Sequence, residues 1–238
     1  MRLDKLLAQC GYGTRTEVKV LLKKKQVTVN DAVETSAKRQ VEAHEVRVMG
    51  EAVELPPSEL TLIMHKPVGY ACTHNPAESP LIYDLIPEAW AKVSLSSAGR
   101  LDRETSGLLI LSTDGQLLHQ LVHPKKKVEK RYRVGYEEEL ASDAVERALE
   151  GIELKDEERP CLPAKLEIHA PSPDGLGQAT LTLREGRYHQ VRRMIAAVGG
   201  HVVTLHRDEV GGLVLPEALA EGECRVLTQE ELDQLVGC

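Results

Sequence analysis

Phenylalanine is absent from this 238-residue sequence, and six tyrosines and one tryptophan supply all of its Phe, Tyr and Trp rings. Because so few rings are available for core packing or stacking, each tyrosine beside a polar motif becomes a candidate for function. The cysteines are odd in number, widely scattered and never form a C-x-x-C pair; they are Cys10, Cys72, Cys161, Cys224 and Cys238. This pattern excludes a disulfide framework and a zinc knuckle, and it predicts plain thiols.

Long apolar runs are also missing. No stretch approaches the roughly 20 apolar residues that a membrane span needs, and Asp4 and Lys5 interrupt the apolar residues at the start, so no signal peptide is expected. We therefore expect a soluble cytoplasmic protein without membrane contact. The common hydrolase and nucleotide-phosphate motifs are absent. His119 and His123 have the spacing of metal ligands on a helix, but no nearby acid completes a site, so no metal is expected.

Net charge is −7, which taken alone argues against nucleic acid, because phosphate binding depends on clustered cations. The distribution of charge reverses that impression. Residues 1–50 carry ten Lys/Arg against six Asp/Glu, whereas residues 51–238 carry twenty against thirty-one. The acidic runs at 137–139 and 156–158 are most simply solvated surface. Local basic clusters can therefore still bind phosphate.

The first fifty residues predict a small helical domain with a hairpin. Leucines recur at helical spacing over residues 3–7, and Thr14 with Glu17 forms the pattern of a capping box before a second, basic helix. An alternating strand at 26–29 and a partner at 46–48 complete the pattern. A polar linker with two prolines follows and predicts a boundary near residue 58. The lysines of this segment either bind RNA or are only solvated.

The remainder, residues 59–238, predicts an α+β domain with a mostly antiparallel mixed sheet. Strand-like and helix-like stretches alternate irregularly. The expected strands are 60–65, 107–112, 132–136, 164–169, 179–184 and 201–206, and the expected helices are 114–122, 142–151 and 189–198. We therefore expect two domains, 1–58 and 59–238.

Four polar clusters lie beside these strands, where a sheet could bring them into one cleft. They are residues 66–70, 99–115, 125–132 and 185–194. The second is a glycine-bounded loop that presents Asp102 between arginines just before a buried strand. Most such loop aspartates cap a helix or satisfy a turn, and this loop alone does not separate that reading from catalysis.

Taken together, these clusters resemble the pseudouridine synthases, specifically the RsuA type that modifies small-subunit ribosomal RNA. The most specific strings are Gly99-Arg-Leu-Asp102-x-x-Thr-x-Gly107-Leu-Leu and Glu185-Gly-Arg-Tyr-His-Gln-Val-Arg192-Arg-Met194. The first fifty residues resemble the RNA-binding module named after the fourth protein of the small ribosomal subunit, here the S-four-like domain. The resemblance covers nearly the whole chain.

Residue by residue, the resemblance implies that Asp102 is the catalytic carboxylate, that Tyr132 stacks on the target uracil, and that Arg192 forms an ion pair with Asp102. Arg100 would help to fill the space left by the extruded base. Leu205 would pack against the uracil. The other expected substrate-binding residues are basic. They are Lys66 and, at RNA phosphates, Arg187, Arg193, Arg15, Lys19 and Lys23.

The implied reaction explains these residue types. Uracil is cut from the sugar, rotates and rejoins through carbon 5, so nothing is oxidised and no cofactor is expected. The nucleotide must leave its stack, at a cost of a few kcal/mol, and stacking on Tyr132 returns about 1 to 3 kcal/mol. Whether Asp102 attacks the sugar carbon or removes a neighbouring proton stays open. Both routes need the carboxylate ionised, which a close cation favours.

The implied substrate is one uridine of 16S rRNA, that at position 516, in free RNA or in an assembling small subunit. An alternative is a relative that modifies 23S rRNA. An alternative of another class is a non-catalytic ribosome-assembly factor that only binds rRNA. No apolar stripe suggests assembly with a second copy, so a monomer is expected.

Overall fold

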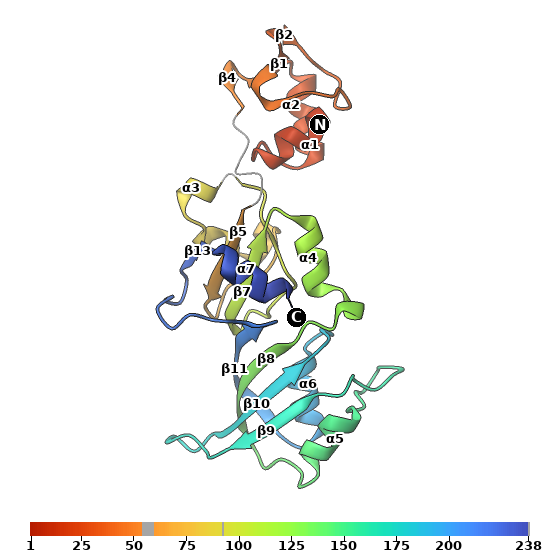
Figure 1. Cartoon of the computed structure of the whole chain (residues 1–238), viewed down its shortest axis with the longest axis vertical. Coiled ribbons are helices and arrows are strands. Elements are labelled where there is room, and N and C mark those ends of the chain that lie inside the picture. The colour runs from red at the N-terminus through yellow and green to blue at the C-terminus, as the bar shows by residue number, and fades with distance from the viewer. Residues whose placement is uncertain (54–59, 92, 238) are drawn as a thin grey trace. The chain divides into compact units, whose positions relative to one another are not determined.

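The computed structural model describes residues 1–53, 60–91 and 93–237, and the domain boundary expected near residue 58 lies outside them. The chain divides into two compact units, residues 1–60 with 86–96 and residues 61–85 with 97–238. Each unit is described by itself below (Figure 1). Within the described residues, no helix is long and apolar enough to cross a membrane.

The first unit packs two short helices on a small antiparallel sheet of strand order β2-β1-β3-β4 (Figure 1, red to orange). Its elements are α1 (Leu3–Gln9), α2 (Arg15–Lys23), β1 (Val27–Val29), β2 (Ala32–Val33), the 3-10 turn η1 (Ala43–Glu45), β3 (Val46–Val48) and β4 (Glu51–Ala52), with α3 (Glu88–Ala91) in the second segment. The expected capping box is present: the Thr14 hydroxyl accepts from the Glu17 N–H, and the Glu17 carboxylate accepts from the Thr14 N–H. The leucines of α1 are completely buried in the core of this unit.

The second unit is built on one long sheet with strand order β13-β5-β7-β11-β8-β10-β9. Its strands are β5 (Thr61–Lys66), β7 (Ser106–Ser112), β8 (Lys130–Glu137), β9 (Lys165–His169), β10 (Gly177–Leu183), β11 (His201–Val210), β12 (Leu213–Val214) and β13 (Cys224–Val226), and β6 (Ser96–Ser97) stands where the units divide. Strands β7 and β11 pair in parallel, and the other neighbours along this order are antiparallel. This arrangement confirms the expected α+β class with a mostly antiparallel mixed sheet.

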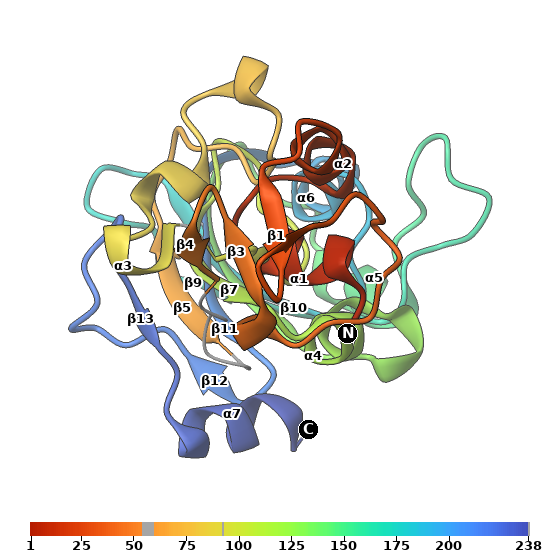
Figure 2. The same cartoon turned by 90° about the horizontal axis from the view of Figure 1, so that it is seen from above.

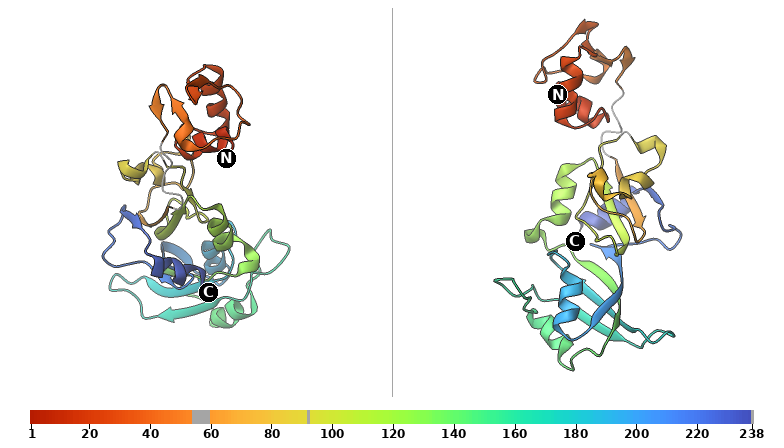
Figure 3. Two further views of the ribbon diagram at one scale, coloured as in Figure 1. Left: turned by 45° about the horizontal axis from the view of Figure 1, so that its top comes forward. Right: turned by 180° about the vertical axis from the view of Figure 1, so that it is seen from behind.

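Helices pack against the long sheet of the second unit. They are α4 (Gly115–Val122), α5 (Ala144–Glu150), α6 (Gln190–Ala197) and α7 (Gln229–Val236), with single 3-10 turns η2 (Pro76–Glu78), η3 (Ile82–Leu85) and η4 (Pro124–Lys126). Helix α7 lies beside β12 and α4 (Figure 2, dark blue). Helix α6 packs on β11 (Figure 3, right panel). The sequence pattern did not predict α7 or the short strands β12 and β13.

Strand β7 is buried along its whole length, which explains why residues 107–111 read as a nearly unbroken apolar run. Its first residues pair with β11 through Gly107 opposite Arg207. Gly107 has a φ of 113°, and a Cβ at this position would collide with the carbonyl oxygen of Arg207. Only glycine therefore allows β7 and β11 to approach here, directly after the loop that carries Asp102.

Candidate active site

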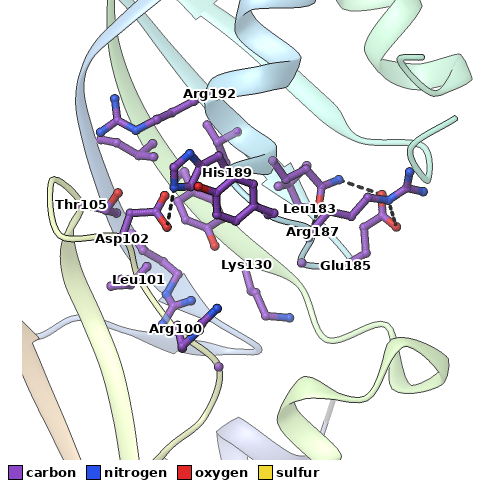
Figure 4. A pocket seen from close by; sticks show the side chains of 18 of the residues that line it. Arg100, Leu101, Asp102, Thr105, Lys130, Leu183, Glu185, Arg187, His189 and Arg192 are labelled. Atoms are coloured by element: carbon purple, nitrogen blue, oxygen red, sulfur yellow. Dashed lines mark hydrogen bonds and ion pairs between the residues drawn. The ribbon is translucent and has the colours of Figure 1, made fainter. Parts of the chain in front are cut away.

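A cavity of about 360 Å³ opens in the second unit, at the point where the loop before β7 and the strands β8, β10 and β11 meet the start of α6 (Figure 4). Three of the four polar clusters contribute to its walls. The lining residues used below are Arg100, Asp102, Lys130, Tyr132, Arg187, His189, Arg192, Leu205 and Arg207. Residues more than a hundred positions apart in the sequence therefore share one small space.

Asp102 lies in the loop before β7, with its side chain 31% exposed. The backbone of this loop is held at three consecutive carbonyls. That of Arg103 accepts from the Gly69 N–H at 2.7 Å, that of Glu104 from Arg192 Nη2 at 3.3 Å, and that of Thr105 from Lys66 Nζ at 2.8 Å. The carboxylate is thus presented by a loop whose backbone is fixed from two other segments, residues 66–69 and helix α6.

Lys66 was expected to touch RNA, and the structure contradicts this, because the residue is 0% exposed. Its ammonium donates to the carbonyls of Pro67, Thr105 and, at 3.4 Å, Arg103. Burial lowers the pKa of Lys66, a trend that nearby groups including Asp102 and Glu104 oppose. Lys66 therefore positions the Asp102 loop and makes no contact with solvent.

The expected ion pair between Asp102 and Arg192 is not formed within the described residues. Arg192 instead donates to the carbonyls of Val202 and Glu104, so it reaches Asp102 only through the loop backbone. The imidazole that faces the carboxylate belongs to His189, whose Nε2 lies 3.5 Å from Asp102 Oδ1 (Figure 4, dashed line). The Arg192 guanidinium is therefore bound by two backbone carbonyls and not by the Asp102 carboxylate.

His189 is a residue that the sequence reasoning did not single out, although it stands within the Arg192 string. It precedes α6 in a left-handed conformation with a φ of 47°, which is unfavourable for a residue with a side chain. Its ring stacks on Tyr188, with centroids 3.9 Å apart. Strained backbone of this kind is typical of functional sites, where the surrounding structure holds a side chain in place.

Tyr132 and Leu205 line the cavity from neighbouring strands, β8 and β11, as buried side chains. Strand register places Tyr132 opposite Arg207 and Leu205 opposite Val134. Side chains two apart on a strand share a face, so Leu205 and Arg207 both reach the cavity beside Tyr132. Together they form a wall that contains one aromatic ring and one apolar side chain, which suits a flat heterocycle.

Arg187 and Arg193 were expected at RNA phosphates, but both guanidinium groups are occupied by the chain itself. Arg187 donates to the carbonyls of Arg159 and Pro160, and Arg193 donates to that of Lys155. Both also form salt bridges with Glu157. The acidic run at 156–158 is thus not merely solvated, because Glu157 neutralises two of the expected phosphate ligands.

Arg100 is exposed at the edge of the cavity, as a residue that meets RNA would be. In the first unit, Arg15, Lys19 and Lys23 are exposed and recur every four residues along α2, so they share one face. Among the described side chains, no group of three or more His, Cys, Asp or Glu could hold a metal ion.

Two further basic residues in the cavity, Lys130 and Arg207, were not among the expected site residues. Burial and the nearby Arg207 lower the pKa of Lys130 to about 8. The carbon of the Arg207 guanidinium lies 6.0 Å from the centroid of the Tyr132 ring. The strings Glu129-Lys-x-Tyr132 and Leu205-His-Arg207 contained the only signal in the sequence that could have found them.

Comparison with known proteins gives consistent results. The profile of the family described as RNA pseudouridylate synthase matches residues 60–197, and that of the S4 domain matches residues 1–46. The chain is 40% identical to the ribosomal small subunit pseudouridine synthase A of Vibrio cholerae, with 98% of both proteins covered. It is 38% identical to the protein of the same description from Escherichia coli K12, over 99% of this chain and 100% of the relative. A crystal structure described as a pseudouridylate synthase is 37% identical, with a TM-score of 0.69 over 99% of this chain and 100% of the other.

Proposed function

Since this chain belongs to the RNA pseudouridine synthase family, we propose that it isomerises one uridine of small-subunit ribosomal RNA and that Asp102 is the reacting carboxylate. The observation that carries the proposal is the convergence of Asp102, Tyr132 and Leu205 on one cavity of about 360 Å³. An acid, a flat ring and an apolar side chain are what a flipped nucleotide would meet. A protein that only binds RNA has no need for a held carboxylate among cations.

The proposed roles follow from the geometry. The uridine leaves its stack, its uracil lies against Tyr132 and Leu205, and its sugar faces Asp102. Arg192, Lys66 and Gly69 keep the loop backbone in place, so Asp102 meets the sugar without a loss of loop freedom at that moment. His189 faces the same carboxylate, with its Nε2 3.5 Å from Asp102 Oδ1.

Arg100 is proposed to occupy the space that the base leaves in the RNA, because it is exposed at the mouth of the cavity. Residues 1–58 are proposed to form an RNA-binding domain ahead of a catalytic domain, with Arg15, Lys19 and Lys23 at phosphates. Each phosphate contact should add about 1 to the magnitude of the slope of log K for RNA binding against log salt concentration. Replacement of Lys19 or Lys23 by Gln should reduce that slope.

The names of the relatives from Vibrio cholerae and Escherichia coli support the small subunit as the source of the substrate. Within it we propose the uridine corresponding to position 516, and a uridine in 23S rRNA is the alternative. The enzyme is proposed to act in the cytoplasm, where bacterial ribosomal subunits are made, as a single copy.

The experiment is a complementation test in a bacterium that lacks its own enzyme of this type. The strain expresses the wild-type chain, Asp102→Asn or the matched control Glu104→Gln, which changes an exposed carboxylate two residues away. Pseudouridine is then mapped in both large rRNAs. We expect the site in 16S rRNA with the wild type and the control but not with Asp102→Asn. Persistence of the modification with Asp102→Asn refutes the catalytic role, and a site in 23S rRNA refutes only the choice of substrate.

A further inference from the structure

The cavity contains a buried cation without a counter-ion. Arg207 is 2% exposed, and its Nε donates to the carbonyl of Leu108 at 2.9 Å. Its Nη2 is buried and has no acceptor among the described residues, and no acid there lies within salt-bridge distance. Since a buried donor left unsatisfied costs about 1 to 3 kcal/mol and more when charged, such a group calls for a ligand.

A second cation lies beside the first. Lys130 extends from β8, the strand next to that of Arg207, and lines the same cavity (Figure 4). Its ammonium donates to the Val128 carbonyl at 3.0 Å and forms no salt bridge within the described part of the chain. The nearness of Arg207 contributes to the lowered pKa of Lys130. The two positive charges of Lys130 and Arg207 lie close together although their repulsion destabilises the fold. Such an arrangement is typical of a binding site for negative charge.

The position of these cations indicates which part of a bound nucleotide they would meet. Arg207 lies 6.0 Å from the Tyr132 ring, and it is buried, whereas Arg100 at the mouth is exposed. A phosphodiester is charged, strongly hydrated and part of the RNA backbone, so we expect it at the exposed mouth of the cavity, near Arg100. The exocyclic oxygens of a uracil stacked on Tyr132 are neutral acceptors that can enter a dry site.

The chemistry of the step requires stabilisation at those oxygens. When the bond between uracil N1 and the sugar carbon breaks, its electron pair goes to the uracil. The sugar carbon either bonds to the Asp102 carboxylate or loses a neighbouring proton to it. In both routes the uracil is an anion until carbon 5 bonds to the sugar, a step that breaks the ester to Asp102 in the first route and returns the proton from Asp102 to the sugar in the second. It becomes neutral pseudouridine after the carbon 5 proton leaves and N1 takes up a proton. The negative charge is shared between the two exocyclic oxygens meanwhile.

We infer that Arg207 and Lys130 bind the exocyclic carbonyl oxygens of the flipped uracil and stabilise the uracil anion while it is detached from the sugar. This inference rests on the proposed function. It assigns the two residues to the leaving group, whereas Asp102 acts on the sugar. Preorganised cations at the atoms where charge develops are among the strongest contributions that an enzyme makes to a rate.

The test measures single-turnover conversion by the full-length protein, with small-subunit rRNA from cells that lack the modification. Four proteins are compared: wild type, Lys130→Met, Arg207→Lys and the control Lys165→Met. The control removes an exposed lysine of β9 that lies outside the cavity. Arg207→Lys keeps a charge at a site where loss of the whole side chain could prevent folding. The Kd for RNA and the rate at saturating enzyme are measured separately, for uridine and for 5-fluorouridine at the target. The rate that is compared is that of cleavage of the bond between N1 and the sugar, because 5-fluorouracil has no carbon 5 proton to lose afterwards.

We expect Lys130→Met to lower the saturated rate about 100-fold, with little change in Kd and in the salt dependence of binding. Arg207→Lys should give a smaller loss, and Lys165→Met none. With 5-fluorouridine the defect should shrink, because fluorine itself stabilises the detached ring anion. A defect confined to Kd with a reduced salt slope would assign the cations to a phosphate and overturn the inference. So would an equal defect on both bases or no defect. A wild-type protein that leaves uridine unchanged would refute the proposed function instead.

Discussion

Replacement of Lys130 by Met should make the folded protein more stable at neutral pH, although it removes a group from the cavity. The fall in the pKa of Lys130 from 10.5 to about 8 is worth about 3 kcal/mol, because each pKa unit corresponds to about 1.4 kcal/mol. This penalty arises mainly because folding removes water from the ammonium. The variant also loses the hydrogen bond to the Val128 carbonyl, which lowers its stability by about 1 kcal/mol. A net gain of about 2 kcal/mol is therefore expected at pH 7.

The gain should depend on pH in a defined direction. Below pH 8 the amine is protonated in both the folded and the unfolded chain, so the wild type carries the whole penalty. Between pH 8 and 10.5 the folded chain has already released a proton that the unfolded chain still holds, so the wild type becomes relatively more stable as pH rises. At pH 9.5 about 1.5 kcal/mol of the penalty remains, which leaves Met an advantage below about 1 kcal/mol.

Urea unfolding followed by circular dichroism at pH 7 and 9.5 measures this difference. Lys165→Met serves as the control, because its exposed lysine should change the free energy of unfolding by less than about 0.5 kcal/mol. A Met variant that is less stable than the wild type at pH 7, or whose advantage does not shrink at pH 9.5, would refute the reasoning.

Three further predictions concern the supports of the site. Lys66→Met leaves two close backbone carbonyls without their donor and should lower the free energy of unfolding by about 2 to 4 kcal/mol; an unchanged melting temperature would contradict this. Gly107→Ala should destabilise by about 3 kcal/mol or more, because its methyl group meets the Arg207 backbone, whereas Gly69→Ala, with open space around it, should cost about 1 kcal/mol. Thermal melts that rank the two alanine variants the other way would refute the packing argument. Glu157→Gln removes the acid that pairs with Arg193 and that shares Arg187 with Glu185, so RNA should bind a few-fold more tightly with a steeper salt dependence. Filter binding at two salt concentrations checks it, and unchanged affinity would show that those arginines stay on their carbonyls.

Much of the architecture was predictable because its causes are local. The capping box of α2 involves residues three apart, and the alternation of buried and half-buried side chains along β10 follows from the strand alone. Helix α7 begins with the same type of box, at Thr228 and Glu231, yet its short sequence was not read as a helix. Strand β13 has only three residues and none of them is buried, so its pairing with β5 left no signal in the sequence.

The sequence by itself determined the fold class and the family, which the comparisons confirm. It also led to Asp102, Tyr132 and Leu205, which the structure brings to one cavity. Motif strings and periodic burial are properties of neighbouring residues, and therefore a single sequence displays them.

Only the tertiary structure decided what each cation meets. Lys66 and Arg192 both bind backbone carbonyls of the loop after Asp102, from 39 and 88 residues away. His189, not Arg192, faces the carboxylate, and the Nη2 of Arg207, beside Tyr132, has no acceptor among the residues that the structure describes. A long basic side chain can reach many acceptors, and the energies of a carbonyl, a carboxylate and water differ little until burial removes the water. The packing of distant segments selects among them, and no local pattern records that choice.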